Sequence, residues 1–182
     1  MTFFRTTTWP LLALLMIFLA ACTAPGEDLP PACPEASVLE NADSLTRFRE
    51  GPGRDLIDVI FTGRMVNLNG SCIYDVDDTD AGVLNMDVSV EVQVNRGTAN
   101  RNRLAEFDYF VSVLDANGAV LSKEIFPLAI RFIGNATTAR ETDAPVSLVI
   151  PVTAEQISAD FRVFVGFQLN PEEVRYNRQK IN

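Results

Sequence analysis

A regular alternation of apolar and polar residues over positions 84–94 restricts the fold of this chain more than any other feature. Six apolar side chains, the first Leu84 and the last Val94, are separated one by one by five polar side chains. Successive side chains of a β-strand point to opposite faces, so a period of two places all six on one face. The segment is therefore expected to be a strand of an antiparallel sheet, with one face in the core and the other in water.

Other parts of the chain show the same period, or short apolar runs between turn residues. The expected strands are 55–66, 71–75, 84–94, 107–114, 119–125, 128–133, 146–152 and 161–169. The pair Asn117-Gly118 predicts a hairpin turn, and Pro127, which has no N–H, is expected at a strand end or on an edge strand. Because turns rather than long helices separate these segments, the chain is expected to be all-β, an antiparallel immunoglobulin-like β-sandwich of about 7–8 strands.

Two short segments contain the residues that begin helices. The sequence Thr153-Ala154-Glu155-Gln156 has the form of a capping box. Near the C-terminus, Asn170 and Pro171 suit the cap and the first position of a helix, with acidic residues in its first turn and basic residues toward its end. A short C-terminal helix is therefore expected to follow the last strand.

The first 22 residues predict export from the cytoplasm. Arg5 precedes an apolar run at 11–19, which is too short to span a bilayer and is followed by small residues. The end of this leader, Leu19-Ala20-Ala21-Cys22, resembles the lipobox of bacterial lipoproteins. The resemblance implies a signal peptide at 1–21, cleavage before Cys22, and acyl chains such as palmitate on that cysteine. The alternative is an ordinary signal peptide, which leaves Cys22 as a free thiol.

The residue after the lipobox bears on the membrane that the chain reaches. Thr23 stands where lipoproteins retained at the inner membrane commonly carry aspartate, so the resemblance implies the periplasmic face of the outer membrane. The rest of the chain is similar in general character to envelope lipoproteins with sandwich domains, and this likeness implies no activity.

The two other cysteines, Cys33 and Cys72, are expected to form a disulfide, because thiols oxidise in compartments outside the cytoplasm. The alternative, a redox pair, lacks the CxxC spacing. Residues 22–32 are rich in proline and are expected to form a tether that extends to at most about 36 Å. The domain at 33–182 would then work close to its membrane.

The composition excludes several classes of function. The chain has no histidine, which rules out a Ser-His-Asp triad, a Cys-His dyad and a histidine-ligated zinc. Its 24 acidic and 15 basic residues give a net charge of -9, which argues against nucleic-acid binding. We therefore expect no enzyme and no cofactor, apart from the lipid on Cys22 and, as an alternative, calcium.

Two loops contain candidate site residues. One holds four aspartates, whose oxygens are the ligands that calcium prefers but whose spacing differs from that of an EF-hand, so an ordinary solvated turn is expected and a calcium site is the alternative. These are Asp75, Asp77, Asp78 and Asp80. The other loop gathers Arg96, Arg101 and Arg103, whose guanidinium groups recognise carboxylates and phosphates. It is a candidate contact for an anionic lipid headgroup or an acidic partner, with a soluble hairpin tip as the alternative.

The anchor, the short tether, the β-rich domain and the lack of a catalytic set together predict a non-enzymatic accessory or protein-interaction module of the cell envelope. An exposed sheet edge of such a domain is a common place for a partner strand to add. The expected partners are therefore the bilayer, through acylated Cys22, and an envelope protein. The alternative is a lipoprotein that binds a small molecule or calcium.

Overall fold

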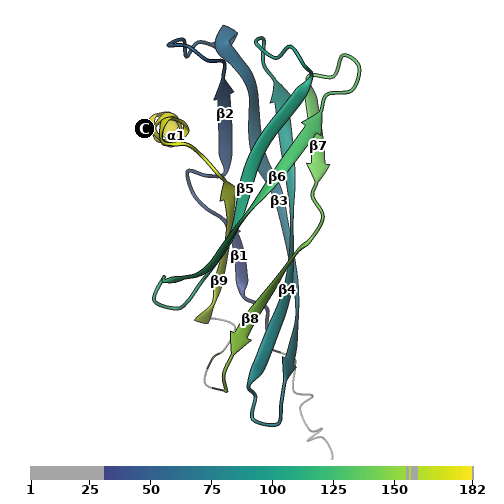
Figure 1. Cartoon of the computed structure of the whole chain (residues 1–182), viewed down its shortest axis with the longest axis vertical. Coiled ribbons are helices and arrows are strands. Elements are labelled where there is room, and N and C mark those ends of the chain that lie inside the picture. Colours follow the sequence, from purple (N-terminus) through teal and green to yellow (C-terminus); the bar gives the residue numbers. More distant parts are fainter. Residues whose placement is uncertain (1–30, 155, 157–159, 182) are drawn as a thin grey trace, which may run out of the picture. The chain divides into compact units, whose positions relative to one another are not determined.

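Nine strands form a sandwich of two sheets in the part of the chain that the computed structural model describes, residues 31–154, 156 and 160–181 (Figure 1). One sheet has the strand order β1-β9-β5-β6, and the other has the order β2-β3-β4-β7, with β8 also paired to β4. The strands are β1 (Glu35–Val38), β2 (Ser44–Phe48), β3 (Val59–Val76), β4 (Gly82–Arg96), β5 (Leu104–Leu114), β6 (Val120–Arg131), β7 (Thr138–Thr142), β8 (Val146–Val152) and β9 (Arg162–Phe167). The expected β-sandwich is confirmed.

The core lies between the sheets and is built on the alternation in β4. Its six apolar side chains from Leu84 to Val94 are each at most 2% exposed. They belong to one cluster with apolar side chains of β5 and β9, including Phe107 and Phe167, whose rings meet edge to face at 5.1 Å. Burying each such side chain stabilises the fold by about 1.5–3 kcal/mol. The period of two in the sequence thus sets which face of β4 enters the core.

Two pairs of expected strands are each one continuous strand. The segments 55–66 and 71–75 merge into β3, because Gly70 continues the strand instead of ending it, but the strand begins at Val59, after a 3-10 helix η1 (Leu56–Asp58) where a strand was expected. A Cβ at Gly70 would lie 3.0 Å from the Met86 side chain of β4, so glycine leaves room here for that buried side chain. The segments 119–125 and 128–133 merge into β6, in which Pro127 stands within an edge strand, as expected.

Three strands of four or five residues were not expected, namely β1, β2 and β7. Such short segments do not repeat an alternating pattern often enough to reveal it. Of these, β1 pairs with β9 in parallel, so the sandwich has nine strands instead of about 7–8 and is not wholly antiparallel. The long separation in sequence between β1 and β9 hides this pairing from a local pattern.

The edge beside β4 is one strand interrupted in the middle. Both β7 and β8 run antiparallel to β4 on the same side, and Asp143 lies in the gap between them. Asp143 donates its N–H to Val90 of β4, and its carboxylate accepts the hydroxyl of buried Tyr109 in β5 at 2.7 Å. This hydrogen bond links the interrupted edge of one sheet to the centre of the other.

The expected cap of the C-terminal helix is present, whereas no helix is described directly after Thr153, where residues 155 and 157–159 lie outside the described chain. The Asn170 side chain accepts the N–H groups of Glu172 and Glu173, both at 2.9 Å, and begins helix α1 (Pro171–Ile181). Asn177 fixes α1 beside β2, because its amide donates to the carbonyls of Asn41 and Ser44. In the other predicted capping box, the Gln156 side chain accepts the N–H of Thr153 at 3.0 Å. No described helix is long and apolar enough to cross a membrane.

Candidate functional site

The predicted leader and lipidation site lie outside the part of the chain that the structure describes. The signal peptide 1–21, Cys22 and most of the tether 22–32 lie outside the described residues. The described chain begins at Pro31, beside the first residues of the sandwich. The anchor therefore stays a prediction.

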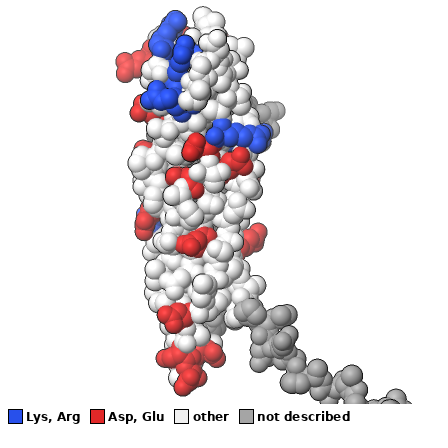
Figure 2. Space-filling view, turned by 90° about the vertical axis from the view of Figure 1, so that its right-hand side faces the viewer, with Lys and Arg blue, Asp and Glu red and all other residues white. Residues whose placement is uncertain are grey.

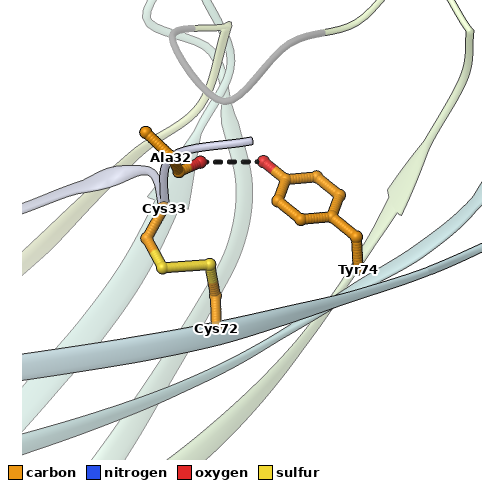
Figure 3. The surroundings of a disulfide bond; sticks show 4 residues. All are labelled: Ala32, Cys33, Cys72 and Tyr74. Carbon is orange, nitrogen blue, oxygen red and sulfur yellow. Dashed lines mark hydrogen bonds between the residues drawn. A yellow bond between two sulfur atoms is a disulfide. The ribbon is translucent and has the colours of Figure 1, made fainter. Parts of the chain in front are cut away.

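The expected disulfide joins Cys33 and Cys72, with their Cα atoms 5.7 Å apart (Figure 3). It ties the chain just before β1 to the last part of the long strand β3 (Val59–Val76). Beside it, the Tyr74 hydroxyl donates a hydrogen bond to the carbonyl of Ala32 at 3.1 Å, so the last residue of the expected tether is held against β3. This bridge fixes the position at which the tether joins the domain.

The four aspartates form the turn of the β3–β4 hairpin. The Asp77 carboxylate accepts the hydroxyl and N–H of Thr79 and the N–H of Ala81, and these bonds, the hydroxyl first, lower its pKa below the usual value. Among the described residues, no three acidic, histidine or cysteine side chains come together as metal ligands. The geometry agrees with the expected turn, in which the Asp77 carboxylate accepts hydrogen bonds from its own loop, and the calcium alternative stays a prediction.

The same turn occurs between β5 and β6. There the carboxylate of Asp115 accepts the N–H groups of Asn117 and Ala119, as the carboxylate of Asp77 accepts those of Thr79 and Ala81. The fourth residue of each turn has a positive φ, 84° at Gly118 and 59° at Asp80. The two hairpin turns therefore need the same positive φ at their fourth residue. Only the β5–β6 turn has glycine there, which adopts a positive φ without steric cost.

Exchanging these two residues should change stability in opposite directions. Gly118→Ala should lower the free energy of unfolding by about 1 kcal/mol, because an L residue is strained at a positive φ. No steric clash adds to this cost, since a Cβ at Gly118 meets no neighbour within 4 Å. Asp80→Gly should raise it by about 0.5 kcal/mol by relieving the same conformation. Urea unfolding of both variants checks this; a loss of stability in Asp80→Gly would mean that the Asp80 carboxylate has a role beyond the turn.

The arginine loop lies at the other end of the sandwich. Strand β4 runs about 50 Å from the acidic turn to Arg96, and Figure 2 shows basic side chains gathered at the end opposite the acidic tip. The Arg96 guanidinium donates to the carbonyl of Asn100, whose buried side chain holds the loop, while Arg101 and Arg103 are exposed. The register of β3 and β4, in which Arg96 lies opposite Phe61 and Cys72 opposite Met86, separates this loop from the disulfide.

Two features escaped the sequence analysis. The first is the outer edge of β6, with which no other strand in the described part of the chain pairs. The second is a groove of about 470 Å³ between the end of β2, the loop at 49–54 and helix α1. The apolar run of β6 was visible in the sequence, but its place at an edge follows only from the strand order.

Comparisons with known proteins establish no family for this chain. No protein-family model and no curated protein matches it. A similar solved structure is the variable domain of the Streptococcus agalactiae AgI/II polypeptide BspA, with 14% sequence identity and a TM-score of 0.18. The match covers 70% of this chain and 73% of that one.

Proposed function

We propose that this chain is a lipid-anchored accessory protein of the periplasmic face of the outer membrane, which binds a partner protein by strand addition to β6. One observation carries the proposal: β6 is a twelve-residue edge strand whose outer backbone groups have no partner strand in the described chain. Extended segments of other proteins add to such edges through main-chain hydrogen bonds.

The backbone direction in β6 follows from two contacts and from the position of its proline. The Ser122 carbonyl accepts the hydroxyl of Ser112 in β5, and the N–H of Phe132 donates to the carbonyl of Arg103, so even-numbered residues face β5. Odd-numbered Pro127, which has no N–H, fits the outer side. Because residues two apart in a strand share their direction, Lys123 and Ile125 point their N–H and C=O groups outward.

Apolar side chains make this part of the edge suitable for a protein partner. Val120, Leu121 and Ile125 are 60%, 53% and 53% exposed, around the β5–β6 hairpin that reaches out at the lower left of Figure 1. Lysine often shields an edge, but the Lys123 ammonium lies over the ring of Phe110, 4.4 Å from its centre. Pro127 limits the available edge on one side, so the partner strand would pair with about five residues.

The anchor part of the proposal predicts a change of cell fraction. Cys22→Ser should move the chain from the membrane fraction to the soluble periplasmic fraction, because several acyl chains, at about 0.8 kcal/mol per buried CH₂, make anchoring effectively permanent. Fractionation followed by detection of the chain measures this. A Cys22→Ser chain that stays with the membrane would contradict lipidation as the anchor.

Strand addition predicts that a backbone change in β6 weakens partner binding. Ile125→Pro removes one outward N–H and should weaken binding about tenfold or more, since an unpaired main-chain group costs about 1–3 kcal/mol. The matched control, Ile125→Thr, loses the apolar side chain but keeps the N–H. The measurement is photo-crosslinking in the native envelope from a reactive residue at position 121 of the full chain.

The expected result is one protein adduct that persists in Ile125→Thr and is strongly reduced in Ile125→Pro. An adduct unaffected by the proline would exclude pairing at this edge. An adduct with the mass of two copies of this chain would replace the accessory role with self-association. Thermal unfolding of both variants confirms that the sandwich is intact.

A further inference from the structure

The groove between β2 and α1 is lined by residues from opposite ends of the domain sequence. Arg47 belongs to β2, Arg49 and Arg54 follow it in the next loop, and Arg175 comes from α1. The lining also includes Glu50, Glu172 and Glu173. What the groove can bind therefore depends on which of these charges are already paired.

Two of the arginines are neutralised by buried acids. Arg47 lies 2.8 Å from the carboxylate of Glu173, whose side chain is 7% exposed, and Arg49 lies 2.5 Å from that of Asp58, which is 4% exposed. Asp58 also accepts the N–H of Asp55, and so it organises the loop that carries Arg49. Arg47, Glu173 and Arg49 line the groove, and the Arg49 side chain stays 61% exposed.

The other two arginines, Arg54 and Arg175, are balanced in the lining by two exposed acids, Glu172 and Glu50, with which a ligand anion would have to compete. Arg54 is held in place by the carbonyls of Gly51 and Gly53 and by the ring of Phe48, 5.3 Å from its guanidinium carbon. Its acidic partner, Glu172, is 57% exposed, and an exposed ion pair contributes little to stability. Arg175, one helical turn after Glu172, is exposed and forms no ion pair within the described residues.

Aromatic rings supply the apolar part of the groove. Phe48 and Tyr176 meet edge to face at 5.1 Å, and both line the groove. A volume of about 470 Å³ lies in the range of sites for small molecules. Guanidinium groups bind carboxylates and phosphates, and rings bind flat apolar groups.

We infer that this groove binds a small aromatic anion, whose carboxylate or phosphate contacts Arg54 and Arg175 in the place of the Glu172 carboxylate. In the free protein Glu172 occupies Arg54 as an internal competitor. The anionic group of the ligand takes the place of the exposed Glu172 carboxylate at Arg54. The ligand also contacts Arg175 and the rings of Phe48 and Tyr176. This site is independent of β6 and of any partner strand.

Because Glu172 competes with the ligand for Arg54, removing its charge should tighten ligand binding. The full chain in detergent micelles is titrated with phenyl phosphate, benzoate or inorganic phosphate, and NMR chemical shifts are followed. Glu172→Gln removes the competitor and should tighten binding of an aromatic anion about fivefold, whereas Arg175→Gln should weaken it about fivefold. Arg101→Gln, an exposed arginine outside the groove, should change it less than about twofold.

The two aromatic probes distinguish the anionic groups, and saturable binding of either one with this order of variants supports the site. Inorganic phosphate, which has no ring, should bind about tenfold more weakly than phenyl phosphate. Three results would overturn the inference: no saturable shifts with either aromatic probe, equal affinity in Glu172→Gln and the parent chain, or equal affinity for phosphate with and without the ring. Thermal unfolding of Glu172→Gln verifies that α1 remains docked.

Discussion

Replacing Cys33 and Cys72 together with serine is expected to lower the free energy of unfolding by about 4 kcal/mol, the largest effect of any change considered for this domain. The bridge spans 39 residues of sequence, which include β1, β2 and the first part of β3. Without it the unfolded chain gains the freedom of that loop. Because β1 has four residues and a single parallel pairing, it should be the first strand to detach.

Urea unfolding of the full chain measures this loss, and replacing both cysteines avoids a stray thiol. Tyr74→Phe serves as the local control, since it removes the exposed hydrogen bond to Ala32 beside the bridge and should cost less than about 1 kcal/mol. If the double serine variant unfolds at the same urea concentration as the parent chain, the disulfide does not hold β1 to β3.

The hydrogen bond between Tyr109 and Asp143 has the second largest expected effect. Tyr109 is 1% exposed, so Asp143→Ala leaves a buried hydroxyl without its acceptor and should cost about 2 kcal/mol. Tyr109→Phe should cost a similar amount. Because one bond is lost in each case, the double variant should lose much less than the sum, with a coupling energy of about 1–2 kcal/mol in urea unfolding. Additive losses would show that the two groups act separately.

The same pair predicts a loss of stability at high pH. Burial, and then the hydrogen bond and negative charge of Asp143, raise the pKa of Tyr109 above its ordinary value. The folded chain therefore keeps this proton where the unfolded chain releases it. The contribution is complete below about pH 10 and is lost as the pH rises further. Tyr109→Phe should make the urea midpoint less dependent on pH between about 9.5 and 11.5 than it is in Tyr74→Phe.

Local sequence patterns predict those helices and strands that are determined by residues close to one another in the chain. The alternation in β4 predicts both its strand and its buried face, and the Asn170 cap predicts the start of α1. Each of these rests on contacts within a few residues. The position of Pro127 on an edge is also confirmed, because its missing N–H excludes an interior place in a sheet.

The features that escaped prediction depend on residues far apart in the sequence. Arg54 and Glu172 are separated by 118 positions, so their ion pair and the groove around it follow only from the packing of α1 on β2. The parallel pairing of β1 with β9 arises in the same way. The acidic loop is a different case, since aspartate serves both as a cation ligand and as a turn residue, and the hydrogen bonds of Asp77 within its own loop agree with the solvated turn that the sequence favours.

Amide hydrogen exchange in β6 tests the central claim, strand addition at its outer edge, most directly. The full chain is labelled in native envelope vesicles and, separately, after purification in detergent, and the exchange of residues 120–126 is compared by mass spectrometry. We expect the amides of Lys123 and Ile125 to exchange about tenfold or more slowly in the vesicles, because a partner strand accepts hydrogen bonds from their outward N–H groups. Equal exchange in vesicles and detergent would contradict strand addition at β6.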